Sequence, residues 1–168
     1  VTDANNCSDT SNVSITNATA PSLSISSSNV LCNGNNNGAA TVNPSGGTNP
    51  FTYSWSNGGT SSTISNLSPG NYSVTVTDNN NCTSSSSVSI SQPGVLNSSA
   101  ASTNTSCNGT CDGAVSALAS GGTSPYNYSW NGGLGSGATK SNVCTGSYSV
   151  TITDANNCTA TAMATVNQ

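Results

Sequence analysis

The sequence predicts an all-β fold, and two observations support that prediction. Apolar residues alternate strictly with Ser and Thr from Tyr72 through Val76, and again from Tyr148 through Ile152. This period of two is typical of a strand with one face in a core and the other in water. The second observation is composition, because Ser, Thr, Asn and Gly dominate the chain and all four disfavour helices.

The chain also repeats itself with a period of about 75 residues. Cys32 and Cys107 lie 75 positions apart, as do Trp55 and Trp130. Self-similarity at a fixed period indicates tandem copies of one structural unit. We therefore expect the C-terminal hairpin of a truncated repeat in residues 1–21, a complete repeat in 22–93 and a second complete repeat in 94–168.

Each repeat divides into short strands separated by turns rich in Gly, Pro and Asn. Six or seven strands at this spacing are typical of two packed antiparallel sheets, so we expect immunoglobulin-like β-sandwiches of the PKD or fibronectin type III kind, arranged end to end. In the truncated repeat we expect strands at Val1 to Asp3 and through Val13 and Ile15. In the complete repeats we expect strands at 23–26, 39–43, 51–56, 62–66, 71–77 and 83–91, and at 114–119, 126–130, 147–153 and 159–166.

Charged side chains are nearly missing, which excludes several classes of function. Glu, Arg and His are absent, and Lys140 is the single cation in a chain of net charge −4. Nucleic-acid binding and docking on anionic lipid both need clusters of Lys and Arg, so we expect neither. No apolar run approaches the ~20 residues that cross a bilayer, so we expect no membrane insertion.

The residues that catalysis requires are also missing. Ser is plentiful, but without His no familiar base is present to activate it. Glycosidases need two neighbouring carboxyl groups, whereas the recurring Asp occurs once per repeat. We therefore expect no enzymatic activity and no cofactor.

Asp3, Asp78 and Asp154 each begin an Asp-x-Asn-x-Cys segment. Carboxylate and amide oxygens are calcium ligands, which makes these three residues weak calcium candidates. An EF-hand loop needs more acidic ligands and a closing Glu, and the chain contains no Glu. We favour an Asx turn, in which the side chain accepts hydrogen bonds from nearby backbone N–H groups.

Seven cysteines in a chain without His indicate disulfides in a secreted protein. Zinc is the alternative, but no Cys-x-x-Cys pair is present. Cys111 and Cys144 have no counterparts in the first complete repeat, where the matching residues are Asn36 and Ser68. In an immunoglobulin-like strand order both cysteines lie in loops at one end of the sandwich, so we expect them to pair.

Two pairing schemes remain open for the other cysteines. Each repeat could close on itself, through Cys32 to Cys82 and Cys107 to Cys158. These pairs would lie at opposite ends of a sandwich, ~20 Å apart, whereas a disulfide needs Cα atoms within ~7 Å. In a rod of repeats, the end of one repeat meets the start of the next, so Cys32 could instead bond Cys158. We expect Cys7 to pair with a residue outside this chain.

The recurring aromatic residues have both a structural and a binding interpretation. Trp55 and Trp130, with Tyr53 and Tyr128, could stack on sugars, but their period of two favours burial in the core. Tyr72 and Tyr148 each follow a Gly at the start of a strand, which is typical of a tyrosine corner.

A series of landmarks occurs in the same order in both repeats. In the first repeat they are Cys32-Asn-Gly34, Ser45-Gly-Gly-Thr-Asn-Pro50-Phe-Thr-Tyr53-Ser-Trp55, Leu67-Ser-Pro-Gly70-Asn-Tyr72 and Thr77-Asp78 followed by Cys82. The second repeat has Cys107-Asn-Gly109, Ser120-Gly-Gly-Thr-Ser-Pro125-Tyr-Asn-Tyr128-Ser-Trp130, Gly146-Ser-Tyr148 and Thr153-Asp154 followed by Cys158. The series resembles, over nearly the whole chain, the SprB-type repeat of very long surface adhesins in gliding Bacteroidota. Phe51, in place of the usual Tyr, and the additional Cys111 and Cys144 depart from that pattern.

The resemblance implies a cell-surface protein exported by type IX secretion, which in the best-known members is a filament involved in gliding motility. The repeat also occurs in surface proteins that take no part in gliding. We expect a structural stalk segment of an extracellular adhesin, in which neighbouring repeats of the same chain are the main partners and an adhesive tip is held away from the cell. The alternatives are a carbohydrate-binding module for surface polysaccharide and a fibre or sheath protein that assembles laterally with other copies.

Overall fold

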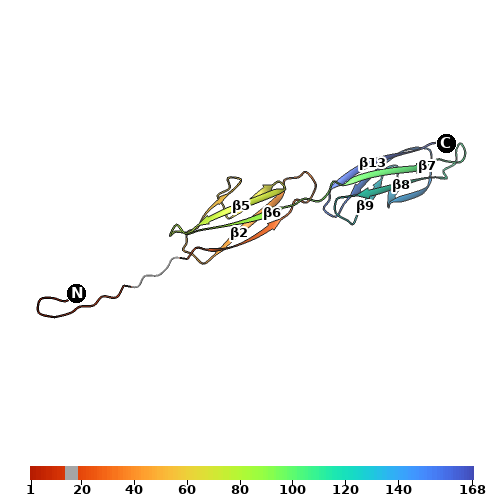
Figure 1. Cartoon of the computed structure of the whole chain (residues 1–168). Coiled ribbons are helices and arrows are strands. Elements are labelled where there is room, and N and C mark those ends of the chain that lie inside the picture. The colour runs from red at the N-terminus through yellow and green to blue at the C-terminus, as the bar shows by residue number, and fades with distance from the viewer. Residues whose placement is uncertain (14–18) are drawn as a thin grey trace.

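The computed structural model describes residues 1–13 and 19–168. It contains two elongated β-structures that follow one another along the chain (Figure 1). We call strands β1–β6 the first unit and strands β7–β13 the second unit. No helix in the described residues is long and apolar enough to span a membrane.

The first unit is a sandwich of two three-stranded antiparallel sheets. One sheet has the order β1-β2-β4 and the other β3-β5-β6. With the strands named A to G in an immunoglobulin-like fold, this arrangement places A, B and E in one sheet and C, F and G in the other. The strands are β1 (Ser22–Ser28), β2 (Gly38–Ser45), β3 (Thr52–Trp55), β4 (Thr63–Leu67), β5 (Gly70–Thr77) and β6 (Thr83–Ile90).

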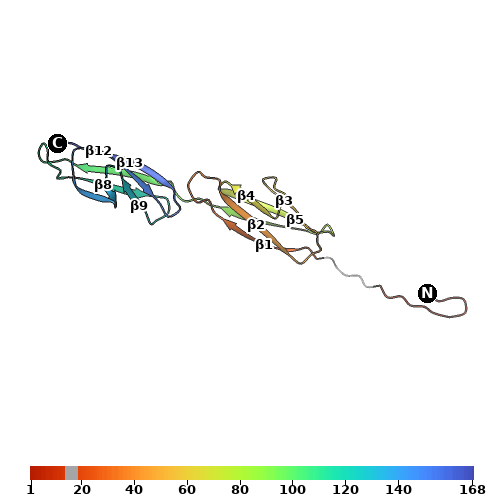
Figure 2. The same cartoon turned by 180° about the vertical axis from the view of Figure 1, so that it is seen from behind.

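The second unit has the same plan with one added edge strand. Its sheets have the orders β11-β8-β7 and β10-β9-β12-β13, so the short β10 extends the second sheet beside the C-type strand β9. Figure 2 shows β12 and β13 side by side, paired from Gly146↔Val166 to Thr153↔Thr159. The strands are β7 (Asn97–Thr103), β8 (Gly113–Ser120), β9 (Asn127–Trp130), β10 (Gly135–Ser136), β11 (Thr139–Val143), β12 (Gly146–Thr153) and β13 (Thr159–Val166). The predicted tandem immunoglobulin-like sandwiches are therefore confirmed.

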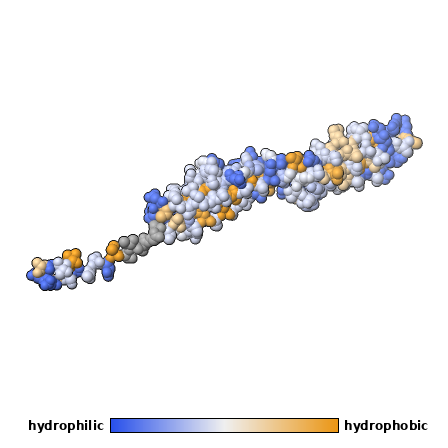
Figure 3. Space-filling view, viewed as in Figure 1, coloured by the Kyte–Doolittle hydropathy of each residue, from blue (hydrophilic) through white to orange (hydrophobic). Residues whose placement is uncertain are grey.

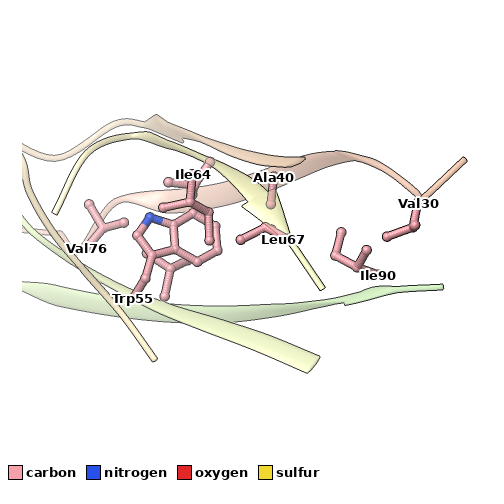
Figure 4. Packing of buried hydrophobic residues seen from close by; sticks show 9 residues of the cluster. Val30, Ala40, Trp55, Ile64, Leu67, Val76 and Ile90 are labelled. Carbon is pink, nitrogen blue, oxygen red and sulfur yellow. The ribbon is translucent and has the colours of Figure 1, made fainter. Parts of the chain in front are cut away.

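The alternating pattern supplies the core of each sandwich. In β5, Val74 and Val76 are fully buried, whereas Ser73 is exposed and Thr75 is half-buried. Figure 4 shows Trp55 facing Ile64 across the space between the sheets, with Val76 beside the indole ring. Each such aliphatic side chain contributes ~1.5–3 kcal/mol on burial, so a few well-placed residues hold a small sandwich together.

The second unit has a separate core built from corresponding positions. Trp130, Val150 and Ile152 occupy the places of Trp55, Val74 and Val76. Because the two clusters share no residue, each unit has its own hydrophobic core.

The outer surface is mostly polar, and its apolar residues are dispersed. Figure 3 shows hydrophilic and intermediate colours over most of the visible face, with separate apolar spots. The most exposed large apolar side chains on the strands are Leu118 and Met163, which lie on different sheets. Scattered single residues of this kind are normal on a soluble surface.

The ten strands expected in the two complete repeats agree with the structure within a few residues at each end. The sequence pattern did not single out β7, β10 or β11, because their residues are small or polar and show little apolar alternation. The truncated repeat was predicted less well. Residues 1–13 contain a turn closed by one isolated bridge between Thr2 and Ser8, and Val13 is not in a strand. Ile15 lies outside the described residues.

Candidate functional site: the junction between the units

Asp154 organises the turn that the second unit presents to the first. Its Oδ1 accepts 2.9 Å hydrogen bonds from the backbone N–H groups of Asn156 and Cys158, and its Oδ2 accepts one of 2.9 Å from Thr123. Gly122 precedes that donor with φ of +59°, and a Cβ there would lie 2.8 Å from Oδ2. Only glycine lets the backbone approach the carboxylate this closely.

The same turn recurs in the first unit and near the N-terminus. Asp78 accepts N–H hydrogen bonds from Asn80, Cys82 and Thr48 at 2.9 to 3.0 Å. Asp3 accepts two of the corresponding bonds, from Asn5 and Cys7, at 2.9 Å. The predicted Asx turns are therefore present in all three copies.

Burial and hydrogen bonding act in opposite directions on these carboxyl groups. Desolvation of Asp154 opposes ionisation, but the N–H groups of Thr123, Cys158 and Asn156 outweigh it together, so the pKa of Asp154 lies below its usual value. The pKa of Asp78 is lowered in the same way, against desolvation, by Cys82, Thr48 and Asn80. Both side chains are buried as carboxylates that accept from the backbone.

The calcium alternative finds no ligand cluster in the structure. No group of three or more His, Cys, Asp or Glu side chains that could hold a metal ion occurs in residues 1–13 and 19–168. Both oxygens of Asp78 and Asp154 already accept backbone hydrogen bonds. These N–H groups stabilise the carboxylates in the way that a cation would otherwise do.

The turn at Asp154 carries one end of a disulfide that joins the two units. Cys32, in the loop between β1 and β2, is bonded to Cys158, in the turn between β12 and β13, with Cα atoms 5.7 Å apart. Of the two pairing schemes that the sequence left open, the structure therefore contains the one between repeats. The two cysteines belong to opposite ends of equivalent sandwiches, and such ends meet only between neighbours.

A hydrogen bond from the second unit to the first accompanies the disulfide. The Asn156 side-chain Nδ2 donates to the carbonyl oxygen of Leu31 at 2.9 Å and also to Thr123 Oγ1 at 3.1 Å. The bonded Sγ of Cys158 lies 3.5 Å from the same Leu31 oxygen. Because a disulfide sulfur carries no hydrogen, we regard this last approach as a packing contact.

The Cys32 loop is fixed to the end of its own unit and to the linker. Val30 donates its N–H to the Ser91 carbonyl oxygen at 2.9 Å. Gly34 donates its N–H to Gln92 Oε1 at 2.9 Å, and Asn33 Nδ2 donates to the Pro93 carbonyl oxygen at 3.0 Å. Both cysteines of the junction therefore lie in loops that are held against the body of their own sandwich.

The second disulfide lies within the second unit. Cys111 is bonded to Cys144, joining the loop before β8 to the residue after β11. In the first unit the matching pair makes a hydrogen bond instead, because Ser68 Oγ donates to Asn36 Oδ1 at 2.9 Å. The same two loops are thus in contact in both units.

Neither disulfide includes Cys7, Cys82 or Cys107. Cys7 and Cys107 are exposed. Cys107 is the counterpart of Cys32, and Cys82 is the counterpart of Cys158. The pairing of Cys7 with a residue outside the chain stays a prediction.

The aromatic residues have structural roles. Trp55 and Trp130 are 3% and 4% exposed, which confirms the prediction that they belong to the core. Their Nε1 atoms donate to the carbonyl oxygens of Ser61 and Gly137 at 2.9 and 3.0 Å. The tyrosine corners are also confirmed, because the hydroxyl groups of Tyr72 and Tyr148 donate to carbonyl oxygens four residues upstream at 2.9 and 3.0 Å.

The sequence interpretation missed Asn156 and Gln92 as junction residues. Asn156 was detectable in principle, since an Asn lies two positions after the Asp in all three copies, at residues 5, 80 and 156. Gln92 carries no such signal, because its role depends on how the Cys32 loop folds over the end of β6.

The comparisons with known proteins agree with the landmarks described above. The family model of the SprB repeat matches residues 24–60 and again residues 99–135. Each match covers the first three strands and the loops between them, which include Cys32 and Trp55 in one copy and Cys107 and Trp130 in the other. No curated protein matches the chain.

Two solved structures of tandem immunoglobulin proteins are also similar. One is described as the structural basis for Dscam isoform specificity, with a TM-score of 0.34 and 13% identity over 77% of this chain. The other contains the N-terminal eight Ig domains of Down Syndrome Cell Adhesion Molecule, with a TM-score of 0.39 and 13% identity over 90% of this chain. This chain spans 40% and 25% of the length of those two chains. The family match, not these structures, identifies the repeat: the chain contains SprB repeats at residues 24–60 and 99–135.

Proposed function

We propose that these repeats form a stalk segment of an extracellular adhesin on a bacterial cell surface, which holds an adhesive tip at a distance from the cell. SprB repeats belong to large surface adhesins. The observation that carries the proposal is the Cys32–Cys158 disulfide, because it bonds opposite ends of two successive sandwiches to each other. A covalent bond in this position fixes an end-to-end order, which is what a spacer requires.

The division of the chain follows from this proposal. Residues 22–93 and 94–168 each form one link of the stalk. Neighbouring repeats of the same chain are then the main partners of each link.

The nearly uncharged surface suits such a stalk. Lys140 is the single cation, and net charge is −4 over 168 residues. Since screening by salt acts on charges, the shape of this stalk depends little on ionic strength. Disulfides belong to the oxidising exterior of the cell, in agreement with an extracellular location.

Immunolabelling and negative-stain electron microscopy test the proposal together. Antibodies raised against the chain should label intact cells, and the isolated full-length protein should form single thin threads. Labelling only after permeabilisation, or compact particles, would contradict a stalk. Bundles or tubes would favour lateral assembly, in which the uncharged edge strands of different copies pair.

A glycan array distinguishes the stalk from a carbohydrate-binding module. The indole rings that could stack on sugars are buried, so the isolated chain should bind no glycan. Reproducible binding to one class of glycan would instead assign the repeats a role in adhesion itself.

A further inference from the structure

The Cys32–Cys158 disulfide encloses most of the chain in one covalent loop. The bonded cysteines are separated by 126 positions, so 125 residues lie between them. Strands β2 through β12 belong to that loop. Of the strands in the described part of the chain, only β1 and β13 lie outside it, one before Cys32 and the other after Cys158.

We propose that this disulfide carries mechanical tension past both sandwiches. A force applied to the two ends of the chain follows the shortest covalent path between them. That path enters through β1 to Cys32, crosses the S–S bond to Cys158 and leaves through β13. Residues 33–157, with most of both cores, are not on the path and bear no tension from the ends.

Within the two units the path is already almost fully extended. β1 (Ser22–Ser28) leads into the junction, and β13 (Thr159–Val166) leads away from it to the C-terminal end of the second unit (Figure 1). A strand rises ~3.3 Å per residue, whereas a fully stretched chain reaches at most ~3.6 Å per residue. Two strands joined by a disulfide can therefore lengthen only slightly before covalent bonds are strained.

Both ends of the disulfide are held in place by the units themselves. The Cys32 loop is fixed by the hydrogen bond from Val30 N–H to the Ser91 carbonyl oxygen at 2.9 Å. The Cys158 N–H donates a 2.9 Å hydrogen bond to Asp154 Oδ1. Asn156 Nδ2 donates a 2.9 Å hydrogen bond to the Leu31 carbonyl oxygen. Each cysteine is thus held by hydrogen bonds to the sandwiches that it connects.

The consequence is a segment that keeps its length under load without relying on the stability of its cores. Sandwiches this small unfold with modest free energies, and each would release a long stretch of chain if force passed through it. The covalent path is the same whatever the stalk is attached to, so the proposal does not depend on whether the protein is an adhesin.

Single-molecule force spectroscopy of the whole chain between two reference domains tests the proposal. The measured quantity is the fully stretched contour length, which depends on covalent connectivity even for a variant that folds poorly. Fully extended, the 125 enclosed residues would span ~440 Å. The oxidised wild-type chain should not release this length, and adding a reductant should release it.

Variants separate the two disulfides. The Cys111–Cys144 bond has a separation of 33 and so encloses 32 residues; 125 minus 32 leaves 93. Without reductant, the contour length of the double variant Cys32→Ser/Cys158→Ser should exceed that of the wild-type chain by those 93 residues, or ~325 Å. Cys111→Ser/Cys144→Ser is the matched control, and it should gain nothing, because its disulfide lies inside the enclosed loop.

That control also gives the result that would overturn the proposal. If tension runs through the second unit, removing Cys111–Cys144 adds its 32 enclosed residues, or ~110 Å, to the contour length. A gain of that size, or release of both units from the oxidised wild-type chain, would exclude the proposed path.

Discussion

Asn156 of the second unit donates a 2.9 Å hydrogen bond from its side-chain amide to the carbonyl oxygen of Leu31 in the first unit. The same amide donates a 3.1 Å hydrogen bond to Thr123 Oγ1. In the first unit, Asn80 Nδ2 donates the equivalent hydrogen bond to Thr48 Oγ1 at 2.8 Å. One side chain therefore stabilises a turn within its own unit and contacts the neighbouring one.

This relationship predicts different effects for two equivalent substitutions. In a chain without the Cys32–Cys158 bond, Asn156→Ala should increase the motion of one unit relative to the other, because it removes the side-chain hydrogen bond between them. Asn80→Ala removes only the bond within the first unit and serves as the control. The measurement is ¹⁵N relaxation, which gives the tumbling of each unit. Equal effects of both substitutions would show that the Leu31 contact does not restrain the junction.

The Cys111–Cys144 pair and its Asn36–Ser68 counterpart can be exchanged between the two units, and each exchange has a predicted effect on stability. Replacing this pair with Asn and Ser, as in the first unit, should destabilise the second unit by ~3–4 kcal/mol, the loop-entropy cost for a closed loop of this size. The reverse double variant, Asn36→Cys/Ser68→Cys, should form a new disulfide, because Ser68 Oγ and Asn36 Oδ1 already lie 2.9 Å apart.

Differential scanning calorimetry of thermal unfolding measures both effects. Loss of the Cys111–Cys144 bond should lower the Tm of the second unit by more than ~10 °C. The new disulfide between positions 36 and 68 should raise the Tm of the first unit. Failure of the two introduced thiols in the first unit to oxidise would mean that these loops are not held in the arrangement described.

The tyrosine corners predict a specific contribution from one hydroxyl group. Tyr72→Phe removes the 2.9 Å bond to the Ser68 carbonyl oxygen and should cost ~1 kcal/mol, or ~4–8 °C in the Tm of the first unit. Tyr53→Phe is the control, because no hydrogen bond of its hydroxyl group is found in the described residues. A similar loss in both variants would assign the effect to packing and not to the corner.

The aspartate turns predict the response to acid. The pKa values of Asp78 and Asp154 are lowered by folding, so the unfolded chain binds more protons as the pH falls. Stability from these carboxylates is complete above the unfolded pKa of ~4 and is lost as the pH falls toward their folded values. Asp112, whose pKa is lowered to about 2 chiefly by hydrogen bonding from the Ser106 hydroxyl, acts in the same direction.

Thermal melts between pH 2 and pH 7 measure this dependence. The Tm should be level above about pH 5 and should fall in acid, and Asp154→Asn should lower the Tm at pH 7 and flatten the acid slope of the second unit. Asp9→Asn changes the same charge at an exposed side chain and should do neither. Calorimetric titration with calcium should give no heat, whereas a calcium-dependent rise in Tm would favour a metal site at these turns.

The sequence predicted those features that depend on local pattern. The alternation of Tyr72, Val74 and Val76 predicted a strand, and the period of two that relates Tyr53 to Trp55 predicted the burial of Trp55. Strands β7 and β11 lack that signal, since Ala, Ser, Thr and Asn occupy most of their positions. Those strands form because β8 offers both of its edges for pairing, which is a tertiary effect.

The junction was only partly predictable, for a related reason. Periodicity placed Cys32 and Cys158 at opposite ends of their sandwiches and so made a bond between repeats possible. Choosing that bond over one within each repeat needs the relative position of two sandwiches. The linker residues Gln92 and Pro93 accept hydrogen bonds from the Cys32 loop and help set that relative position. The alternation of apolar and polar residues carries no information about this position.

Disulfide mapping detects the bond between the repeats itself, independently of force or motion. Chymotrypsin cleaves after Phe51, Tyr72 and Tyr148, so digestion without reductant separates Cys32, Cys82 and Cys158 onto different peptides. Because the peptide that ends at Phe51 also contains Cys7, the digest is made from a Cys7→Ser chain. Mass spectrometry should then find the peptide containing Cys32 bonded to the peptide that begins at Ser149 and contains Cys158. A bond from Cys32 to the peptide containing Cys82 would show that Cys32 is not bonded to Cys158.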